Sequence, residues 1–195
     1  MKIHLDERSH RYLTDKGGVV PGIGQIIKAC GAMPDFGFDE GSADFGRAVH
    51  RATEFYDLGM SETWIYGDLI NEYLQGYRLF IEQANPVILG SEQIVHHPDL
   101  DYAGRMDRPI RLNDRVMIMD IKTGGRQEYY WLKGAAYAIA YEREQELPEL
   151  SVGQAILYLR PKAYTLETPK NIMEESAYRK RWLAMVKRYQ DEIAG

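Results

Sequence analysis

The sequence YAGRMDRPIRLNDRVMIMDIKTG, residues 102–124, decides the fold of this chain. Apolar residues fill both halves of the stretch, and Asn113-Asp114 separates them. Asn and Asp tolerate the positive φ values of a tight two-residue turn, so the pair predicts a β-hairpin. Such a turn fixes the register of the two strands, and in that register Asp107 lies directly opposite Asp120.

Two carboxylates facing each other across a hairpin need an explanation. Side chains directly opposite in an antiparallel pair lie about 4.5–5.5 Å apart at Cβ, and like charges there destabilise the sheet. A bound divalent cation would offset this cost, because hard oxygen ligands at that separation can share one ion. A salt bridge from Asp120 to Lys122, with Asp107 paired to an arginine, is the purely structural alternative. The facing geometry favours the cation.

Lys122 adds a basic group to the same face of the strand. Residues two apart in a strand point to the same side, so Asp120 and Lys122 lie together, roughly 6.6–6.8 Å apart along the chain. The rest of the strand is apolar on both faces, which predicts a central position in the sheet. Its apolar residues are Val116 and Ile118 on one face and Met117, Met119 and Ile121 on the other.

This combination suits metal-assisted hydrolysis of a phosphodiester. One or two cations would neutralise and polarise the phosphate and lower the pKa of a bound water. Lys122 would orient or help deprotonate that water, or stabilise the charge that develops in the transition state.

His50 is a further candidate ligand, on a predicted helix at residues 43–58. On a helical wheel it lies away from the apolar stripe, near Gly46 and Thr53. A surface histidine is the ordinary interpretation. Gly46 lowers helix stability one turn earlier, however, which indicates that something approaches closely there. Imidazole also suits manganese or another transition ion.

Hydrophobic periodicity and turn residues predict the remaining elements. The order of helices and strands predicts a mixed α/β domain with a central mixed sheet flanked by helices. The predicted elements are an opening hairpin at 2–5, 12–13 and 19–20, a short helix at 25–30, a loop at 31–41, helices at 43–58 (with Ser42 as N-cap), 67–84, 129–143 and 172–193, and strands at 87–97, 101–112, 115–122 and 154–159.

Composition restricts the class of protein. No apolar run approaches the roughly 20 residues of a membrane span, and the polar N-terminus lacks a signal-peptide core, so we expect a cytoplasmic protein. Cys30 is the only cysteine, which excludes an internal disulfide and a four-cysteine iron–sulfur cluster. The net charge of −5 argues against indiscriminate coating of nucleic acid. A solvated face is the ordinary interpretation of two groups of basic residues, which could also form local basic surfaces: Arg105, Arg108, Arg111, Arg115 and Arg126, and Arg179, Lys180, Arg181, Lys187 and Arg188.

These motifs resemble the PD-(D/E)XK nuclease superfamily, in particular its RecB-like branch. That branch carries Gly-x-x-x-His on a helix, Gly-x-x-Asp on a strand and then Asp-x-Lys-Thr-Gly. Here they are Gly46–His50, Gly104–Asp107 and Asp120–Gly124, in the expected order. The opening segment, with His10-Arg-Tyr12, is similar to phage exonucleases of this group and to the mitochondrial genome maintenance exonuclease.

The resemblance implies a restriction-endonuclease-like core and a set of roles. His50, Asp107, Asp120 and the backbone carbonyl of Ile121 would bind Mg²⁺ or Mn²⁺, and Lys122 would be catalytic. We expect one nuclease domain over residues 1–195, with the core at 43–195 and the hairpin, short helix and loop at 1–42.

Two positions depart from the pattern of the branch. Its Gln-x-x-x-Tyr motif has Lys133 in place of the glutamine, followed by Tyr137, and its Pro-Ser-Val-Thr reads Pro21-Gly-Ile-Gly24 here. Lys133 and Tyr137 are candidates for contacting nucleic acid, with Arg105 and Arg126. Glu92 is a lesser candidate for an additional acid, because a solvent-facing glutamate is its ordinary interpretation.

We therefore expect a metal-dependent DNA nuclease, and from the resemblance an exonuclease of phage or bacterial recombination, repair or replication. A strand-annealing recombinase is an expected partner, and a membrane is not. A nuclease-fold DNA-binding module without activity, a structure-specific endonuclease and an enzyme acting on RNA are the alternatives.

Overall fold

The central hairpin forms as the sequence predicts. A computed structural model of the protein describes residues 2–34, 40–60 and 67–193. In it, β7 (Arg108–Leu112) and β8 (Arg115–Lys122) pair with Leu112 opposite Arg115. Both turn residues have positive φ, 48° at Asn113 and 63° at Asp114, as a tight hairpin turn requires. The predicted register is confirmed from Leu112 back to Arg108, which lies opposite Met119.

This hairpin sits inside a mixed sheet with the strand order β10-β9-β8-β7-β4. The short β4 (Val87–Ile88) pairs antiparallel with β7, and β9 (Gly153–Arg160) pairs parallel with β8. The antiparallel β10 (Ala163–Glu167) forms the far edge. β8 is therefore central, as its two apolar faces predicted, while β10 is a strand that the sequence reasoning missed.

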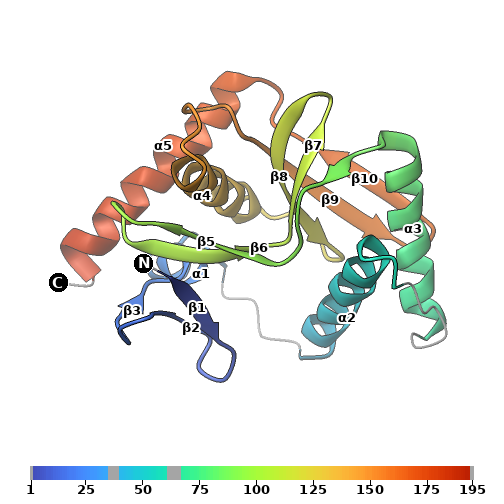
Figure 1. The fold of residues 1–195 in the computed structure, drawn as a ribbon, viewed down its shortest axis with the longest axis horizontal. Coiled ribbons are helices and arrows are strands. Elements are labelled where there is room, and N and C mark those ends of the chain that lie inside the picture. Colours follow the sequence, from blue (N-terminus) through green and yellow to red (C-terminus); the bar gives the residue numbers. More distant parts are fainter. Residues whose placement is uncertain (1, 35–39, 61–66, 194–195) are drawn as a thin grey trace.

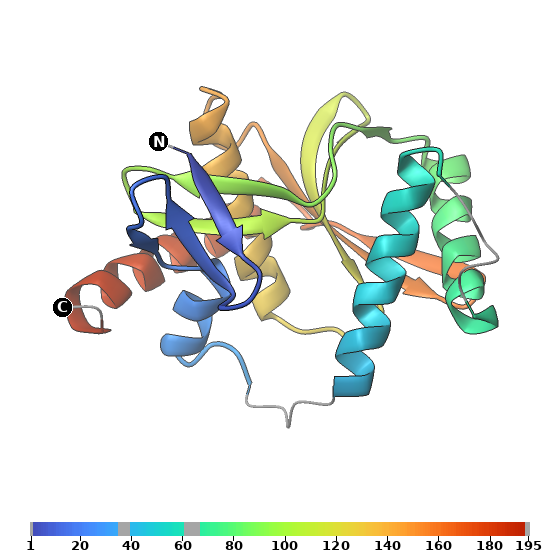
Figure 2. The same ribbon diagram turned by 60° about the horizontal axis from the view of Figure 1, so that its bottom comes forward.

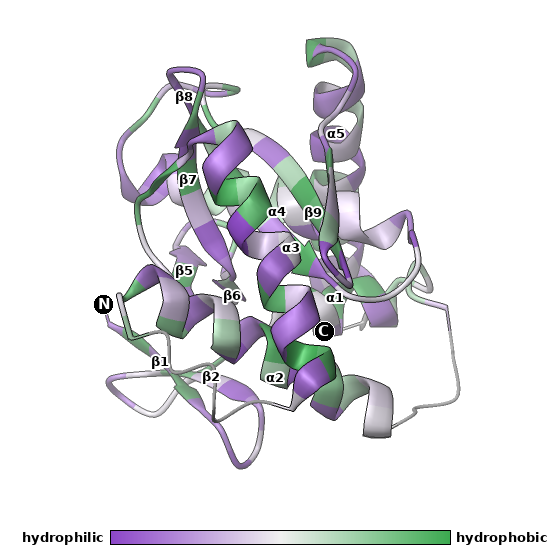
Figure 3. Ribbon diagram, turned by 90° about the vertical axis from the view of Figure 1, so that its right-hand side faces the viewer, coloured by the Kyte–Doolittle hydropathy of each residue, from purple (hydrophilic) through white to green (hydrophobic). Residues whose placement is uncertain are grey.

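Helices cover both faces of the sheet (Figure 1). On one face, α4 (Tyr129–Glu144) and α5 (Ile172–Arg188, followed by a π-helical turn at Tyr189–Ile193) belong to the hydrophobic cluster that contains Ile118. On the other face, α2 (Glu40–Asp57) and α3 (Asp68–Ala84) pack with Met117, Met119 and Ile121. Both helices carry polar and apolar bands (Figure 3), as helices with one buried side do.

A second, smaller layer lies beside this sheet. β5 (Gln93–His97) and β6 (Tyr102–Met106) form an antiparallel ribbon. The N-terminal strands β1 (Ile3–Asp6), β2 (Arg11–Thr14) and β3 (Val19–Val20) form a three-stranded sheet next to it (Figure 2), as predicted for the opening hairpin. The helix α1 (Ile23–Ala29) follows, and the amide of Ala103 donates to the carbonyl of Pro21 at 3.0 Å, joining the two parts.

Three expectations about the elements are wrong. The strands predicted at 87–97 and 101–112 are each broken, the first between β4 and β5 and the second at Asp107. Ser42 is not an N-cap, because α2 already begins at Glu40. Residues 35–39 of the predicted loop lie outside the described residues.

None of the described helices is long and apolar enough to cross a membrane.

Candidate metal centre

Asp107 lies at a bend in the chain rather than within a strand. The pairing of β7 with β8 ends at Arg108 and Met119, so the expectation that Asp107 pairs directly opposite Asp120 is wrong. Instead, the Asp107 carboxylate accepts a hydrogen bond from the backbone N–H of Ile121 at 2.7 Å. The Asp107 side chain thus takes the place of the backbone carbonyl that would accept from Ile121 if the pairing of β7 with β8 continued.

The break before β5 brings Glu92 to the same place. Its φ of 49° turns the chain, and its N–H donates to the carbonyl of Asp107 at 2.9 Å. The ordinary interpretation of Glu92 as a solvent-facing residue of a strand is therefore wrong: its side chain is 24% exposed and points into the site. Gly90-Ser91, a turn-forming pair inside the predicted strand, was the signal that could have revealed this.

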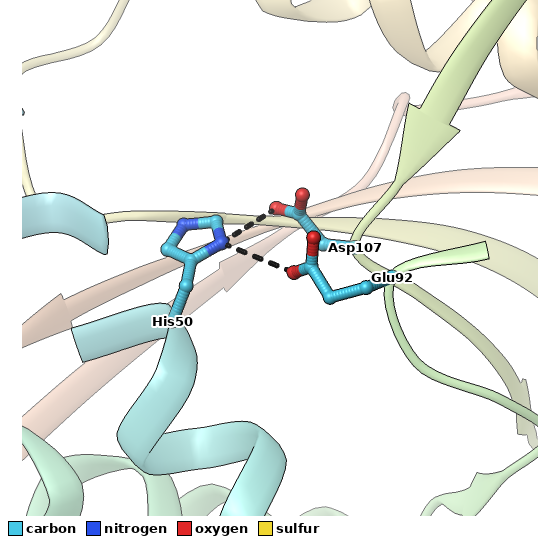
Figure 4. Close-up of side chains that lie close together, drawn as sticks. All are labelled: His50, Glu92 and Asp107. Carbon is cyan, nitrogen blue, oxygen red and sulfur yellow. Dashed lines mark ion pairs between the residues drawn. The ribbon is translucent and has the colours of Figure 1, made fainter. Parts of the chain in front are cut away.

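His50, on α2, faces both carboxylates (Figure 4). Its Nδ1 lies 3.6 Å from Asp107 Oδ2 and 3.7 Å from Glu92 Oε1. Its Nε2 lies 2.9 Å from the carbonyl oxygen of Ile121. One atom from each of His50, Glu92 and Asp107 lies within 4.8 Å of the others, so the trio can reach one metal ion.

A buried ion pair holds α2 against the sheet below this trio. The guanidinium of Arg108, with no exposed surface, donates to Asp57 Oδ2 at 2.7 Å and to the Asp107 carbonyl at 2.7 Å. It also donates to Thr53 Oγ1 at 3.2 Å, and the Thr53 hydroxyl donates to the carbonyl of His50 at 2.8 Å. Arg108 thus fixes the position of His50 relative to Asp107.

The charges of the trio depend on one another. Burial would lower the pKa of His50, but the neighbouring carboxylates of Asp107 and Glu92 outweigh burial and raise it. Burial would raise the pKa of Glu92, and His50 and the nearby arginines lower it. The pKa of Asp107 is also lowered, because His50, Lys122 and Lys133 outweigh its burial. Both carboxyl groups therefore remain ionised and available as ligands.

Asp120 and Lys122 lie on one face of β8, as predicted, on the side covered by α4. The Asp120 side chain is only 3% exposed, and its Oδ2 contacts the ammonium group of Lys122. Neither Asp120 oxygen has a hydrogen bond of good geometry, so this buried carboxylate is incompletely satisfied. Lys122 also donates to the Ile121 carbonyl at 3.0 Å, and Lys133 Nζ lies 4.0 Å from Asp120 Oδ1.

The candidates for contacting nucleic acid lie in different surroundings. Arg105 is paired with Glu7 at 2.7 Å and with Glu92 at 3.2 Å, at the edge of the site. Arg126 is exposed and paired with Glu167 at 2.6 Å. Tyr137 is only 4% exposed, and its ring lies under Lys133 Nζ at 5.9 Å.

Three arginines of the two basic groups are not free surface cations, whereas Lys180, Arg181, Lys187 and Arg188 are exposed on α5. Arg108 is buried against Asp57, and Arg115 is paired with Glu175 at 3.0 Å. Arg179 is buried and paired with Glu142 at 2.6 Å. These arginines join elements of the fold, and they do not present free positive charge to a polyanion.

The two motif glycines differ in their surroundings. A Cβ at Gly104 would lie 2.6 Å from atoms of both Ile23 and Tyr137, so only glycine lets these side chains pack on β6. A Cβ at Gly46 would meet Thr123 Oγ1 at 3.7 Å, an ordinary contact. The expectation of a close approach at Gly46 is therefore wrong for contacts within the protein.

A cleft of about 910 Å³ gives access to the site. Tyr12 and Gly22 line it from the N-terminal part, and α2 contributes Gly46 and His50. Other residues that line it are Glu92, Gly104, Arg105, Asp107, Lys133 and Tyr137. The cluster of possible ligands therefore lies where a substrate could reach it.

The donor set fits a divalent cation. When His50 is neutral and its Nε2–H donates to the Ile121 carbonyl, the lone pair of Nδ1 points toward the carboxylates of Glu92 and Asp107. A cation between Nδ1 and these carboxylates would stabilise that arrangement. Adjacent ligands of an octahedral Mg²⁺ lie about 3.0 Å apart and opposite ones about 4.2 Å, given metal–ligand distances of 2.0–2.1 Å. The trio needs only small movements to reach such separations.

Comparison with known proteins gives only weak likenesses. Neither a protein-family model nor a curated protein matches the sequence. A crystal structure named as a putative exonuclease from Eubacterium rectale is 11% identical, with a TM-score of 0.49, and the match covers 85% of this chain and 70% of that one. The crystal structure of a protein named SSO0001 is 14% identical, with a TM-score of 0.39, covering 88% and 76%. Likenesses this weak do not establish a shared activity.

Proposed function

We propose that the chain is a divalent-metal-dependent DNA nuclease with a restriction-endonuclease-like core in a single domain. One observation carries the proposal: His50, Glu92 and Asp107 converge within 4.8 Å in a cleft. The incompletely satisfied Asp120 and its partner Lys122 lie next to them. A buried carboxylate without good hydrogen bonds beside three more potential ligands favours a bound ion over a purely structural ion-pair network.

The ligand set that we propose contains the side chains of His50, Glu92, Asp107 and Asp120, with the Ile121 carbonyl that the resemblance implies. That carbonyl lies at hydrogen-bond distance from His50 Nε2 and Lys122 Nζ, and it would exchange one of these contacts for the ion. A bound Mg²⁺ or Mn²⁺ would neutralise charge on the scissile phosphate and make an attacking water more acidic. The remaining contribution comes from the chain: the Ile121 N–H fixes the Asp107 carboxylate, and Arg108 holds the helix that carries His50.

Lys122 is the proposed catalytic residue. Its ammonium group lies between Asp120 and the Ile121 carbonyl, so it is held in one place by two acceptors. From there it orients the attacking water and stabilises the negative charge that develops on the phosphate oxygens. Arg105, Lys133 and Tyr137 line the cleft, and there they would contact the DNA backbone or bases, with Arg126 farther out.

Removal of nucleotides from a DNA end is the reaction that we propose, on the basis of the motif resemblance described above. The same resemblance supports a cytoplasmic role in phage or bacterial recombination, repair or replication, beside a strand-annealing recombinase. Internal cleavage, action on RNA, and DNA binding without cleavage are the outcomes that the following experiment separates.

The test uses end-labelled linear DNA, closed circular DNA and a labelled RNA, each with Mg²⁺, Mn²⁺ or EDTA. Asp107→Asn, Asp120→Asn and Lys122→Met are compared with Asp114→Asn and Lys162→Met, which make the same changes away from the site. We expect metal-dependent loss of linear DNA only, abolished in the first three variants and retained in the two controls.

Other results would change the proposal in specific ways. Cleavage of the circle would replace exonuclease by endonuclease activity at the same site, and faster loss of RNA would replace the substrate. DNA binding without cleavage under every metal condition would leave the non-catalytic module as the function.

A further inference from the structure

We infer that this site takes a single divalent cation, and that the ammonium group of Lys133 serves in place of a second one. The inference rests on the proposed function, since it concerns the ion that the nuclease would use. Its basis is the arrangement of charges around Asp120.

Two lysines from different elements flank the Asp120 carboxylate. Lys122, on the same strand, contacts Oδ2, and Lys133, on α4, places Nζ 4.0 Å from Oδ1. Asp120 is also outside the trio of His50, Glu92 and Asp107, whose ligand atoms lie together. A carboxylate that bridged two ions would need both of its oxygens free. With Lys133 kept at Oδ1, only Oδ2 can turn from Lys122 toward an ion, so Asp120 can serve one ion and not two.

The charge of the site points to the same stoichiometry. The carboxylates of Glu92, Asp107 and Asp120 face the ammonium groups of Lys122 and Lys133, which leaves one net negative charge when His50 is neutral. One divalent ion would turn this into one net positive charge, which suits a site for a phosphodiester. A second would leave three positive charges close together in a site where most of these side chains are at least three-quarters buried, and such a concentration is costly.

The surroundings of Glu92 also favour a single ion. Its carboxylate is already shared by two guanidinium groups, with Arg105 at 3.2 Å and Arg108 at 3.6 Å. The two guanidinium groups add positive charge beside this carboxylate, which disfavours a second cation next to it.

Lys133 is held in its place by its own helix. Its side chain is only 25% exposed, and Nζ lies over the ring of Tyr137, one turn later on α4, at 5.9 Å from the centroid. An ammonium group over an aromatic face is stabilised there. The lysine is therefore a fixed positive charge next to Asp120 rather than a mobile surface group.

The experiment counts Mn²⁺ ions bound by the full chain, by isothermal titration calorimetry, and records their electron paramagnetic resonance spectrum. We expect about one ion per wild-type chain with the spectrum of an isolated Mn²⁺. Lys133→Gln should bind about two ions and show the spectrum of a spin-coupled pair, because a carboxylate oxygen is freed. Lys133→Arg, which keeps the charge, and Lys162→Gln, which removes an exposed lysine elsewhere, should both bind about one.

Two ions in the wild type, or one ion in a Lys133→Gln variant that melts like the wild type, would overturn the inference and leave the nuclease proposal intact. No ion in any variant would overturn both. If Lys133→Gln does not fold, the wild-type count and the retained single ion in Lys133→Arg still decide between one ion and two.

Discussion

Asp107 combines two tasks that separate residues usually perform. Its backbone marks the bend between β6 and β7, and its carbonyl accepts from Glu92. Its carboxylate accepts from the Ile121 amide while lying 3.6 Å from His50 Nδ1. The residue that ends the strand pairing is therefore also the residue that fixes the geometry of the ligands.

Arg108 links α2, the helix that carries His50, to the bend at Asp107. Replacing Arg108 with methionine would leave Asp57, with a side chain only 5% exposed, without its ion-pair partner. An unpaired buried charge costs about 3–5 kcal/mol, so we expect Arg108→Met to lower the free energy of urea unfolding by about that amount. The double variant Asp57→Asn/Arg108→Met should recover part of the loss. A loss of less than about 1 kcal/mol in the single variant would contradict this account.

His97, away from the site, should make stability depend on pH. Burial lowers the pKa of His97 below its ordinary value of 6.5, and its unprotonated Nδ1 accepts from the Leu100 N–H at 3.2 Å. The unfolded chain therefore binds the proton more readily, so the stabilising contribution is complete above pH 6.5 and is lost progressively as the pH falls from 6.5 through the lower pKa of the folded state.

The measurement for His97 is the melting temperature from about pH 8 to pH 5. In His97→Asn the amide oxygen can accept from Leu100 but does not titrate, so we expect its curve to fall less steeply than that of the wild type. Replacing the exposed His4 by asparagine should leave the wild-type slope. Equal slopes for wild type and His97→Asn would remove His97 as the cause.

At the scale of the elements, replacing a glycine by alanine should have opposite effects on stability in α2 and in α3. A Cβ at Gly46 on α2 meets only an ordinary contact, so Gly46→Ala should stabilise the helix by about 0.5–1 kcal/mol. A Cβ at Gly76 on α3 would lie against the carbonyl of Ala163 and 2.8 Å from that of Arg160, so Gly76→Ala should destabilise. Thermal unfolding of the two variants tests this pair, and a destabilised Gly46→Ala would contradict it.

The same Gly46→Ala variant also tests what approaches α2 in the proposed nuclease. Gly46 lines the cleft, so a nuclease that becomes more stable but loses affinity for DNA would indicate that the substrate passes close to this turn. Unchanged affinity would mean that the glycine has no part in binding.

The elements that sequence predicted best are those fixed by local chemistry. Asn113-Asp114 determines the turn, the turn determines the register, and the period of two in a strand places Asp120 with Lys122. The amphipathic helices were also predicted to within a few residues. Each of these follows from residues close together in the chain.

What the sequence did not predict depends on partners distant in the chain. Glu92 enters the site because its N–H pairs with Asp107, and nothing in residues 87–97 specifies that partner. Arg115 and Arg179 look like surface cations in the sequence, and only the folded structure pairs them with Glu175 and Glu142. The trio that could hold a metal ion contains Glu92, whereas the ligand set predicted from the sequence contained Asp120 and the Ile121 carbonyl in its place.

At the scale of the whole molecule, binding of the proposed divalent cation should raise the free energy of unfolding. A ligand that binds only the folded state stabilises it by about 2.7 kcal/mol at a hundred times its dissociation constant. We expect Mn²⁺ to raise the melting temperature of the wild type and of Asp114→Asn, and EDTA to reverse the effect. Asp107→Asn should show little or no shift, and an equal shift in Asp107→Asn would place the ion elsewhere.

The bend at Asp107 also determines when the site can come into existence during folding. Its ligands come from α2, from the turn before β5 and from β8, and β8 is held in the sheet by β9, more than thirty residues later in the chain. In a nascent or partly unfolded chain the acidic residues are therefore present, but the sheet that brings them close together has not yet formed. The proposed nuclease activity would thus be restricted to the fully folded chain. In refolding experiments, Mn²⁺ binding should accordingly develop with the slowest phase of tryptophan fluorescence, and binding in an earlier phase would show that the site assembles independently of the sheet.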